Sequence, residues 1–249
     1  MPDILTLILL GGVGALAGFI DAIAGGGGLI ALPALLSVGV PPVAALATNK
    51  MQGAIGTGIA ALTFWRRGLV ALTPMIPAMI ATFIGSYLGA VAVKSIDTST
   101  LKVVVPFALI GIALYFLLAP KITDESRAAR LQFGLFVPLF GFGIGFYDGI
   151  FGPGTGSFFT IAFVTLFGLG ITRAAGHTKV LNFISNLAAL ALFIPAGDVL
   201  WPVAIVMAAG QVIGGYLGAL TGIRFGARLI KPLVVVISVI LAARLLWTA

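Results

Sequence analysis

The chain has 249 residues, of which 60% are hydrophobic and only 8% are charged, and its mean hydropathy is +1.21. Soluble domains carry about 25% charged residues, so this composition excludes a water-soluble globular domain and predicts an all-α polytopic membrane protein. The formal net charge of +7 comes from basic clusters between apolar runs, which is typical of cytoplasmic loops and not of a nucleic-acid partner. The chain has no cysteine, which excludes disulfides and thiolate metal sites.

The apolar runs are long and continuous, whereas the strands of a membrane barrel alternate over about ten residues. In chain order they cover 4–24, 28–40, 43–64, 69–93, 101–119, 132–150, 156–170, 174–195, 199–222 and 232–248. A full span needs about 20 residues, so 28–40 and 156–170 are too short to cross a bilayer. Each follows a glycine cluster, and we expect broken or re-entrant helices there and about eight full spans elsewhere. The first run has no basic residue before it, so it is interpreted as a membrane segment and not as a cleaved signal peptide.

One short motif occurs twice in the chain. Residues 18–28 read GFIDAIAGGGG, and residues 145–155 read GFYDGIFGPGT. Each copy places one acid, Asp21 or Asp148, and a glycine cluster inside an apolar run. Broken helices and buried acids are both costly in lipid, so a duplicated pair of them indicates a binding site.

Further matches between the two sides of the chain follow at one constant offset. Lys50 pairs with Lys179, and the run GSYLGA at 85–90 pairs with GGYLGA at 214–219. The only long polar linker, PKITDESRAAR, lies at the midpoint. We therefore predict an internal duplication within one transmembrane domain, with an N-terminal membrane repeat over 1–125 and a C-terminal membrane repeat over 126–249.

The positive charges predict how the two repeats are oriented. If every segment were a plain span, the basic loop residues would be shared almost equally between the two sides. If 4–40 and 132–170 instead fold back as hairpins, only Lys94 and Lys102 lie opposite the remaining basic loop residues. That majority comprises Arg66, Arg67, Lys121, Arg127, Arg130, Arg173, Arg224, Arg228 and Lys231. The positive-inside rule expects such an asymmetry, and it makes the repeats inverted, an architecture typical of transporters.

The glycine clusters are the first candidate site. A helix that restarts after such a loop exposes unpaired N–H groups and the positive end of its dipole, which suit an anion. Close helix packing is the alternative, since small residues serve it routinely in membranes. The candidate anion-binding residues are Gly25, Gly26, Gly27, Gly28, Gly152, Gly154, Thr155 and Gly156.

Asp21 and Asp148 are candidate proton-coupling residues, because a charged acid in the bilayer centre costs about 2.5–3.5 kcal/mol and protonation lowers that cost. The alternative is that each caps a broken helix by accepting backbone N–H bonds. The two roles are compatible.

A third cluster opens the apolar runs 43–64 and 174–195. Lys50 and Lys179 lie at equivalent depths beside amide and hydroxyl groups, which suits an anion held between the repeats; otherwise the lysines snorkel to water or pair with the two acids. The only histidine, His177, either titrates near neutral pH or is a hydrogen-bonded helix residue. The candidate ligands here are Thr48, Asn49, Lys50, Gln52, His177, Thr178, Lys179, Asn182 and Asn186.

These residues resemble the two signature repeats of the sulfite exporter TauE/SafE family, also called the 4-toluene sulfonate uptake permease family. The resemblance covers nearly the whole chain and is carried by GFIDAIAGGGGLIALPALLSVGVPPVAALATNK and GFYDGIFGPGTGSFF. The second half has Gly-His-Thr-Lys where the first has Ala-Thr-Asn-Lys, so a fully symmetric site is not expected. The resemblance implies a secondary transporter of sulfite, sulfonates or similar small organic anions in a bacterial inner membrane.

The expected function is therefore export of sulfur-containing anions by alternating access, with a proton as the candidate coupling ion. A non-transporting membrane subunit that binds a partner protein and an anion channel are the alternatives. No nucleophile–base pair, metal-ligand cluster or phosphate loop occurs in the sequence, so we expect no enzyme, no cofactor and no metal. The expected partners are the small anion and the bilayer, and association into a homo-oligomer is left open.

Overall fold

The computed structural model describes residues 3–97, 99–100, 137–226 and 229. The predicted segments 101–119 and 232–248 and the central linker lie outside the described residues. The regular structure of the described part is helical, as the composition predicts.

Most helix ends lie within three residues of the ends of the predicted apolar runs. Helix α4 begins seven residues after the start of the run 69–93, and α8 ends five residues before the end of the run 156–170. They are α1 (Ile4–Ala24), α2 (Gly28–Ser37), α3 (Pro42–Arg66), α4 (Ile76–Lys94), α7 (Gly143–Ile150), α8 (Thr155–Thr165), α9 (Ile171–Phe193) and α10 (Trp201–Phe225). A short 3-10 turn (η1, Thr73–Met75) precedes α4, and a π-helical turn (η2, Val137–Phe142) precedes α7.

Three of these helices are long and apolar enough to cross a membrane: Ile4–Ala24, Thr73–Lys94 and Trp201–Phe225. Each exposes large apolar side chains, such as Ile8, Ile80 and Ile213, on its outer surface, as expected of helices that face lipid. Helices α3 and α9 are equally long but more polar, because the candidate ligands lie on them. The structure is that of a membrane protein, while the number of eight full spans stays a prediction.

The helices break at both glycine clusters, as predicted. Helix α1 ends at Gly25, whose φ of 79° is in the left-handed region, and α2 starts at Gly28. Helix α7 ends before Gly152, and α8 starts after Gly154; both glycines have positive φ. Glycine adopts this conformation without steric cost, so each cluster can stop one helix and begin the next within a few residues.

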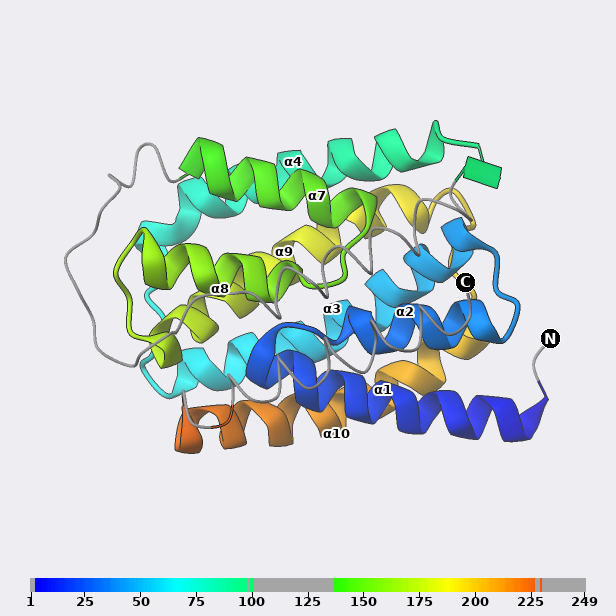
Figure 1. The fold of residues 1–249 in the computed structure, drawn as a ribbon, viewed down its shortest axis with the longest axis horizontal. Helices are drawn as coiled ribbons and strands as arrows, with labels where there is room; N and C mark the ends of the chain where they lie inside the picture. The colour runs from blue at the N-terminus through cyan, green and yellow to red at the C-terminus, as the bar shows by residue number, and fades with distance from the viewer. Residues whose placement is uncertain (1–2, 98, 101–136, 227–228, 230–249) are drawn as a thin grey trace.

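Each broken segment folds back toward the end of the molecule from which it starts. In Figure 1, α1 runs inward from one end and α2 returns to that end, while α7 and α8 enter and leave at the opposite end. Helix α1 packs along α10 and α7 packs along α4, with α3 and α9 in contact between these pairs. The first helix of each half thus packs against the last described helix of the other half.

Matched glycines allow these two helix pairs to approach closely. A Cβ on Gly214 of α10 would overlap the backbone carbonyl oxygen of Ala15 in α1. At the equivalent place, a Cβ on Gly85 of α4 would overlap the backbone carbonyl oxygen of Phe142. The runs GSYLGA and GGYLGA, which identify the duplication in the sequence, therefore make the same kind of contact in both halves.

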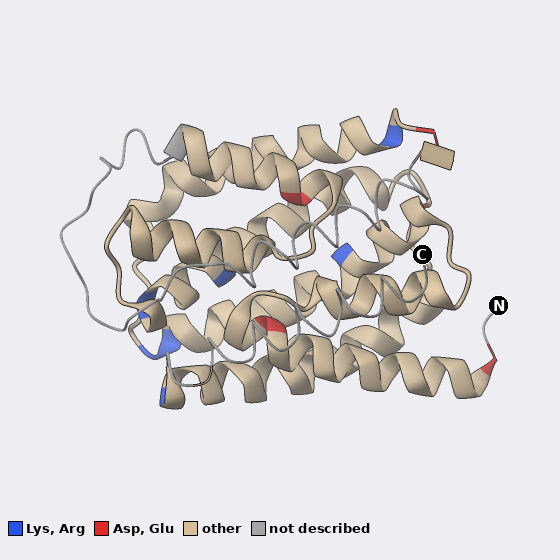
Figure 2. Cartoon of the chain, in the orientation of Figure 1, with Lys and Arg blue, Asp and Glu red and all other residues tan. Residues whose placement is uncertain are grey.

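Basic residues gather at one end of the molecule (Figure 2). The ends of α3 and α10 and the start of α9 meet there, and these carry Arg66, Arg67, Arg224 and Arg173. At the opposite end, the Lys94 ammonium lies 2.7 Å from the Asp198 carboxylate. This partly exposed pair joins the end of α4 to the turn before α10.

Candidate functional site

Two buried ion pairs connect the halves of the chain. The Nζ atom of Lys50 in α3 lies 2.7 Å from Oδ2 of Asp148 in α7. The Nζ atom of Lys179 in α9 lies 3.3 Å from Oδ2 of Asp21 in α1. Both lysine side chains are only 1% exposed, so they do not snorkel to water. Each lysine pairs with the acid of the other half, which the sequence left as one of three alternatives.

The two helix breaks touch each other at the same level. A Cβ on Gly25 would overlap the backbone of Gly156, and one on Gly28 would lie 3.2 Å from the Cα atom of Pro153. The hydroxyl of Ser157 donates to the carbonyl oxygen of Ala24 at 2.5 Å, which satisfies one carbonyl that the end of α1 leaves unpaired. Glycine is needed at this crossing because the backbones lie in direct contact.

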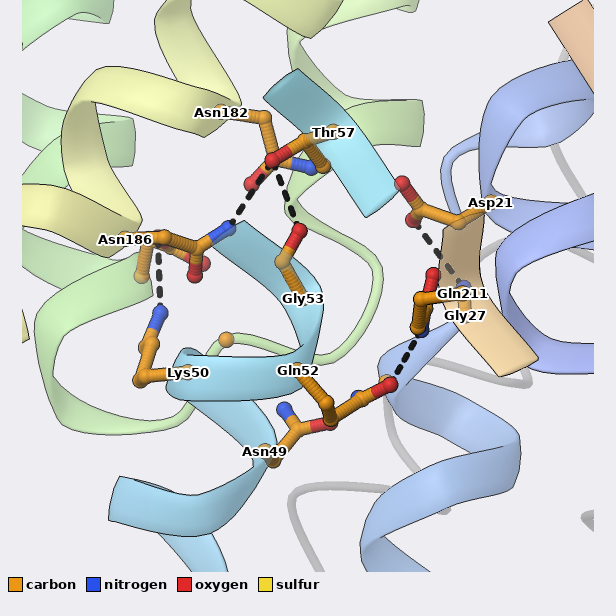
Figure 3. Close-up of a pocket in the computed structure, with 13 residues that line it drawn as sticks. Asp21, Gly27, Asn49, Lys50, Gln52, Gly53, Thr57, Asn182, Asn186 and Gln211 are labelled. Atoms are coloured by element: carbon orange, nitrogen blue, oxygen red, sulfur yellow. Dashed lines mark hydrogen bonds and ion pairs between the residues drawn. The ribbon is translucent and has the colours of Figure 1, made fainter. Parts of the chain in front are cut away.

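A polar pocket lies beside the crossing (Figure 3). It leaves about 330 Å³ unfilled, including the part at its mouth. Figure 3 shows Lys50 and Asn186 on one side of the space and Asp21 and Gln211 on the other. The lining comprises Asp21, Gly27, Gly28, Asn49, Lys50, Gln52, Gly53, Thr57, Asp148, Gly152, Asn182, Asn186 and Gln211.

Side-chain amides form a hydrogen-bonded chain along one wall of the pocket. Gln211 donates through Nε2 to Oε1 of Gln52, and Gln52 donates to Oδ1 of Asn49 at 2.8 Å. On the facing wall, Asn186 lies 3.5 Å from the hydroxyl of Thr57. The carboxamide of Asn182 makes no hydrogen bond with any described residue, and it lines the pocket. The wall therefore holds amide groups that are free to bind a polar solute.

The carboxylate of Asp148 is almost completely enclosed. Its side chain is 2% exposed, and Lys50 lies against its Oδ2 atom. The hydroxyl of Thr155 donates to its Oδ1 atom at 2.6 Å, and the hydroxyl of Ser185 donates to Oδ2. Three donors thus hold this carboxylate in place.

The carboxylate of Asp21 has a more open environment. Its side chain is 13% exposed, and it accepts the backbone N–H of Gly27 at 3.1 Å, as expected of an acid that caps a restarted helix. Lys179 lies at 3.3 Å from the carboxylate and also donates to the backbone carbonyl of Asp21. The positions that match Thr155 and Ser185 are occupied by Gly28 and Gly56, so the first half lacks both hydroxyl donors.

The structure brings ten of the predicted residues together around the pocket. From the glycine clusters and acids these are Asp21, Gly27, Gly28, Asp148 and Gly152; from the third cluster they are Asn49, Lys50, Gln52, Asn182 and Asn186.

The other predicted residues do not line the pocket. Gly25 and Gly156 form the backbone crossing, with Gly26 and Gly154 beside them in the two loops, and Thr155 and Lys179 bind the carboxylates. The hydroxyl of Thr48 accepts the N–H of Leu200 at 3.1 Å. Thr178 faces the hydroxyl of Thr160 at 3.1 Å.

His177 lies near the basic end of α9 and not at the pocket. Its Nδ1 atom is 2.7 Å from the carbonyl oxygen of Arg173, one helical turn earlier. Of the two interpretations left open by the sequence, this contact favours the hydrogen-bonded helix residue.

Three lining residues were missed by the sequence analysis: Gly53, Thr57 and Gln211. Gly53 and Thr57 are the repeat partners of Asn182 and Asn186, so applying the duplication to those two asparagines would have found them. Gln211 lies in the middle of an otherwise apolar spanning helix, and a polar residue at that depth is itself a functional signal.

Comparison with known proteins identifies the chain's relatives. The family model described as "Sulfite exporter TauE/SafE" matches residues 10–245. A "Probable membrane transporter protein" of Haemophilus influenzae is 48% identical over 245 residues, covering 98% of this chain and 95% of the relative. "Probable membrane transporter protein YfcA" of Escherichia coli K12 is 44% identical over 235 residues, covering 94% and 87%. No solved structure gives a significant match.

Proposed function

We propose that this chain, which belongs to the sulfite exporter TauE/SafE family, is a secondary transporter that carries sulfite, sulfonates or similar small anions across a bacterial inner membrane. The observation that carries this proposal is the polar pocket at the meeting point of the two helix breaks, flanked by two ion pairs that each join one half to the other. A transporter needs a site that both halves build, so that their relative movement can expose it on either side.

The charges around the pocket indicate how an anion is recognised there. Lys50 and Lys179 are compensated by Asp148 and Asp21, so the four charges cancel and the lysines do not form a bare cationic site. An anion is bound instead by neutral donors, chiefly the free carboxamide of Asn182 and the amides of Asn49 and Asn186. Moderate binding of this kind also allows release, which transport requires.

Inverted repeats and alternating access are the mechanism that we infer. The opposite entry ends of the two hairpins (Figure 1) and the matched glycine contacts of Gly85 and Gly214 support this inference. Rocking of one half against the other about the backbone crossing would open the pocket first to one end and then to the other.

Transport by the purified protein in proteoliposomes tests the proposal. With radiolabelled sulfite or a small sulfonate, we expect saturable flux. Replacing Asn182 with Ala should raise the KM about tenfold, because a free buried amide is worth roughly 1–3 kcal/mol to a polar ligand. Thr178→Val is the matched control: Thr178 lies one turn earlier in α9 and faces Thr160 instead of the pocket.

The alternatives give different results in the same assay. Flux that never saturates would identify a channel. Absence of flux for every anion, together with stable co-purification of another protein, would identify a non-transporting subunit. An unchanged KM in Asn182→Ala would place the substrate elsewhere.

A further inference from the structure

We propose that Asp21 is the residue that binds and releases the coupled proton, that Asp148 remains ionised in a permanent pair with Lys50, and that the proton and the anion therefore move in the same direction. This inference rests on the proposed transport function. It is carried by the different surroundings of two acids that occupy equivalent positions in the duplicated sequence.

The surroundings of Asp148 oppose the binding of a proton. Lys50, Thr155 and Ser185 all direct donors at its two oxygens. A proton on either oxygen would displace or weaken at least one of these donors and would leave Lys50 with an uncompensated charge at a site that is 1% exposed. Removing one partner from a buried ion pair is strongly unfavourable, so this pair is suited to a structural role.

The surroundings of Asp21 permit protonation. Both acids line the pocket, but the Asp21 side chain is 13% exposed against 2% for Asp148, so a proton can reach Asp21 with water or with the solute. Lys179 donates to the backbone carbonyl of Asp21 as well as to its carboxylate. When the carboxylate takes up a proton, the ammonium keeps that backbone acceptor and is not left without a partner.

Gln211 provides a second, independent observation. Its side-chain Oε1 atom is buried and has no hydrogen-bond donor among the described residues, although its Nε2 atom is used by Gln52. This oxygen lies against Gly18 of α1, one turn before Asp21, and both Gln211 and Asp21 line the same side of the pocket (Figure 3). An unpaired buried acceptor is costly, and a protonated carboxyl group or a protonated solute would supply the missing donor.

The matching position in the other half has no such unpaired atom. Thr82 is the repeat partner of Gln211, and its hydroxyl donates to the carbonyl oxygen of Gly141 at 3.0 Å. Near Asp148, each carboxylate oxygen has a donor, and the Lys50 ammonium is held by the ion pair without a further hydrogen bond. The unpaired acceptor, Oε1 of Gln211, lies on the side of Asp21 (Figure 3).

The other charged groups around Asp21 do not change this assignment. Lys179 of α9 is its direct partner, and Lys50 of α3 and Asp148 of α7 compensate each other at the same pocket. Helices α2 and α8 carry no charged residue, and α10 carries only Arg224, in its last turn. Protonation of Asp21 therefore adds one positive charge to a pocket whose charges otherwise cancel.

An added positive charge favours an anion, and linkage makes the effect reciprocal: a bound anion favours the proton to the same extent. One proton that moves with one monovalent anion makes the step electroneutral. The direction of net transport then follows the combined gradients of the anion and of the proton, which includes export of an accumulated anion.

Methanesulfonate is a suitable probe because it remains a monovalent anion across the neutral pH range, whereas sulfite titrates. For the wild-type protein we expect the Kd for methanesulfonate to rise with increasing pH, by up to about tenfold for each pH unit, since each anion binds together with one proton. Proteoliposomes containing a pH-sensitive dye should acidify as methanesulfonate enters, at equal rates with and without a clamped membrane potential.

Asp21→Asn should make the Kd independent of pH, and anion exchange should continue without any proton flux. If this variant is unstable, Asp21→Asn combined with Lys179→Gln removes both charges of the pair and gives the same expected loss of coupling. Thr155→Val is the matched control, because it weakens the surroundings of Asp148 and should keep the full pH dependence.

Three results would each overturn the inference and leave the transport function intact. The first is full proton flux in both Asp21 variants, the second is loss of coupling in Thr155→Val, and the third is movement of protons opposite to the anion. Anion flux in the wild-type protein without any proton movement would also overturn it. Absence of wild-type flux for both sulfite and methanesulfonate would overturn the transport proposal itself.

Discussion

Asp21 and Asp148 occupy equivalent positions in the duplication, but they differ in the number of hydrogen-bond donors around their carboxylates. Asp148 receives hydroxyl donors from Thr155 and Ser185, while the matching residues near Asp21 are Gly28 and Gly56, which have no side-chain donor. At Gly56 even a Cβ atom would overlap the carboxamide of Gln211. The same backbone framework thus supports one enclosed carboxylate and one open carboxylate.

Replacing Thr155 with Val should therefore destabilise the protein through Asp148. The change keeps the side-chain volume but removes one donor to a buried carboxylate, which is worth about 1–3 kcal/mol. Thermal unfolding in detergent should show a lower midpoint. Thr165→Val is the control, because within the part of the chain that the structure describes the Thr165 hydroxyl bonds only to a carbonyl of its own helix; an equal shift in the two variants would contradict the role of Thr155.

For individual residues, the duplication was the feature of the sequence that best predicted the candidate site. It placed Asp21, Asp148, Lys50 and Lys179 in one site, and all four are close to the pocket. It could not decide between pairing, snorkelling and ligand binding for the lysines, because that depends on which helices meet in three dimensions. Gln211 was missed for the same reason, since it reaches the site through the packing of α10 against α1 and α3.

Among the helices, close packing depends on glycines that face a neighbouring backbone. The best-defined case is Gly214 of α10, where a Cβ would overlap the carbonyl oxygen of Ala15 in α1. Small residues let membrane helices approach in this way, and dispersion contacts replace the hydrophobic effect as the source of stability. The distance between α1 and α10 in turn sets the position of Gln211 relative to Asp21.

Gly214→Ala should push α10 away from α1 and lower stability by about 1–3 kcal/mol, the usual cost of overpacking. Gly12→Ala in α1 is the matched control, because no atom of the described residues lies within 4 Å of its Cβ position; there alanine should be neutral or stabilise the helix by up to about 1 kcal/mol. The thermal unfolding midpoints of the two variants, measured in the same detergent, provide the comparison. Equal midpoints would contradict the close contact.

The helix boundaries followed from the apolar runs and glycine clusters because these are local features of the sequence. The predicted breaks after 24 and near 151–154 are present at Gly25 and Gly152. The packing partners of each helix could not be derived in the same way. Helices α3 and α9 carry the polar residues of the site, and tertiary contacts, which are not local in the sequence, bring these residues together.

Across the whole molecule, the basic residues and the direction of the hairpins give one consistent orientation. The end that gathers Arg66, Arg67, Arg173 and Arg224 should lie in the cytoplasm by the positive-inside rule. Helix α8 ends at this end and α2 ends at the opposite one (Figure 1). The charge counts of the sequence predict the same asymmetry, since loop charges set topology independently of packing.

Ser37 and Thr165 are the last residues of α2 and α8, and they distinguish inverted halves from parallel ones. Because the chain has no cysteine, Ser37→Cys and Thr165→Cys each introduce a single thiol in place of a hydroxyl. In intact bacteria, a membrane-impermeant maleimide should label Ser37→Cys, while Thr165→Cys should react only after lysis, together with Arg67→Cys as a marker of the basic end.

Parallel halves would place Ser37 and Thr165 on the same side and give both the same labelling, because two copies of one fold with one orientation end their hairpins on one face. Opposite labelling would mean that the two hairpins enter the membrane from opposite faces, as inverted halves require, and this is the geometry that alternating access needs.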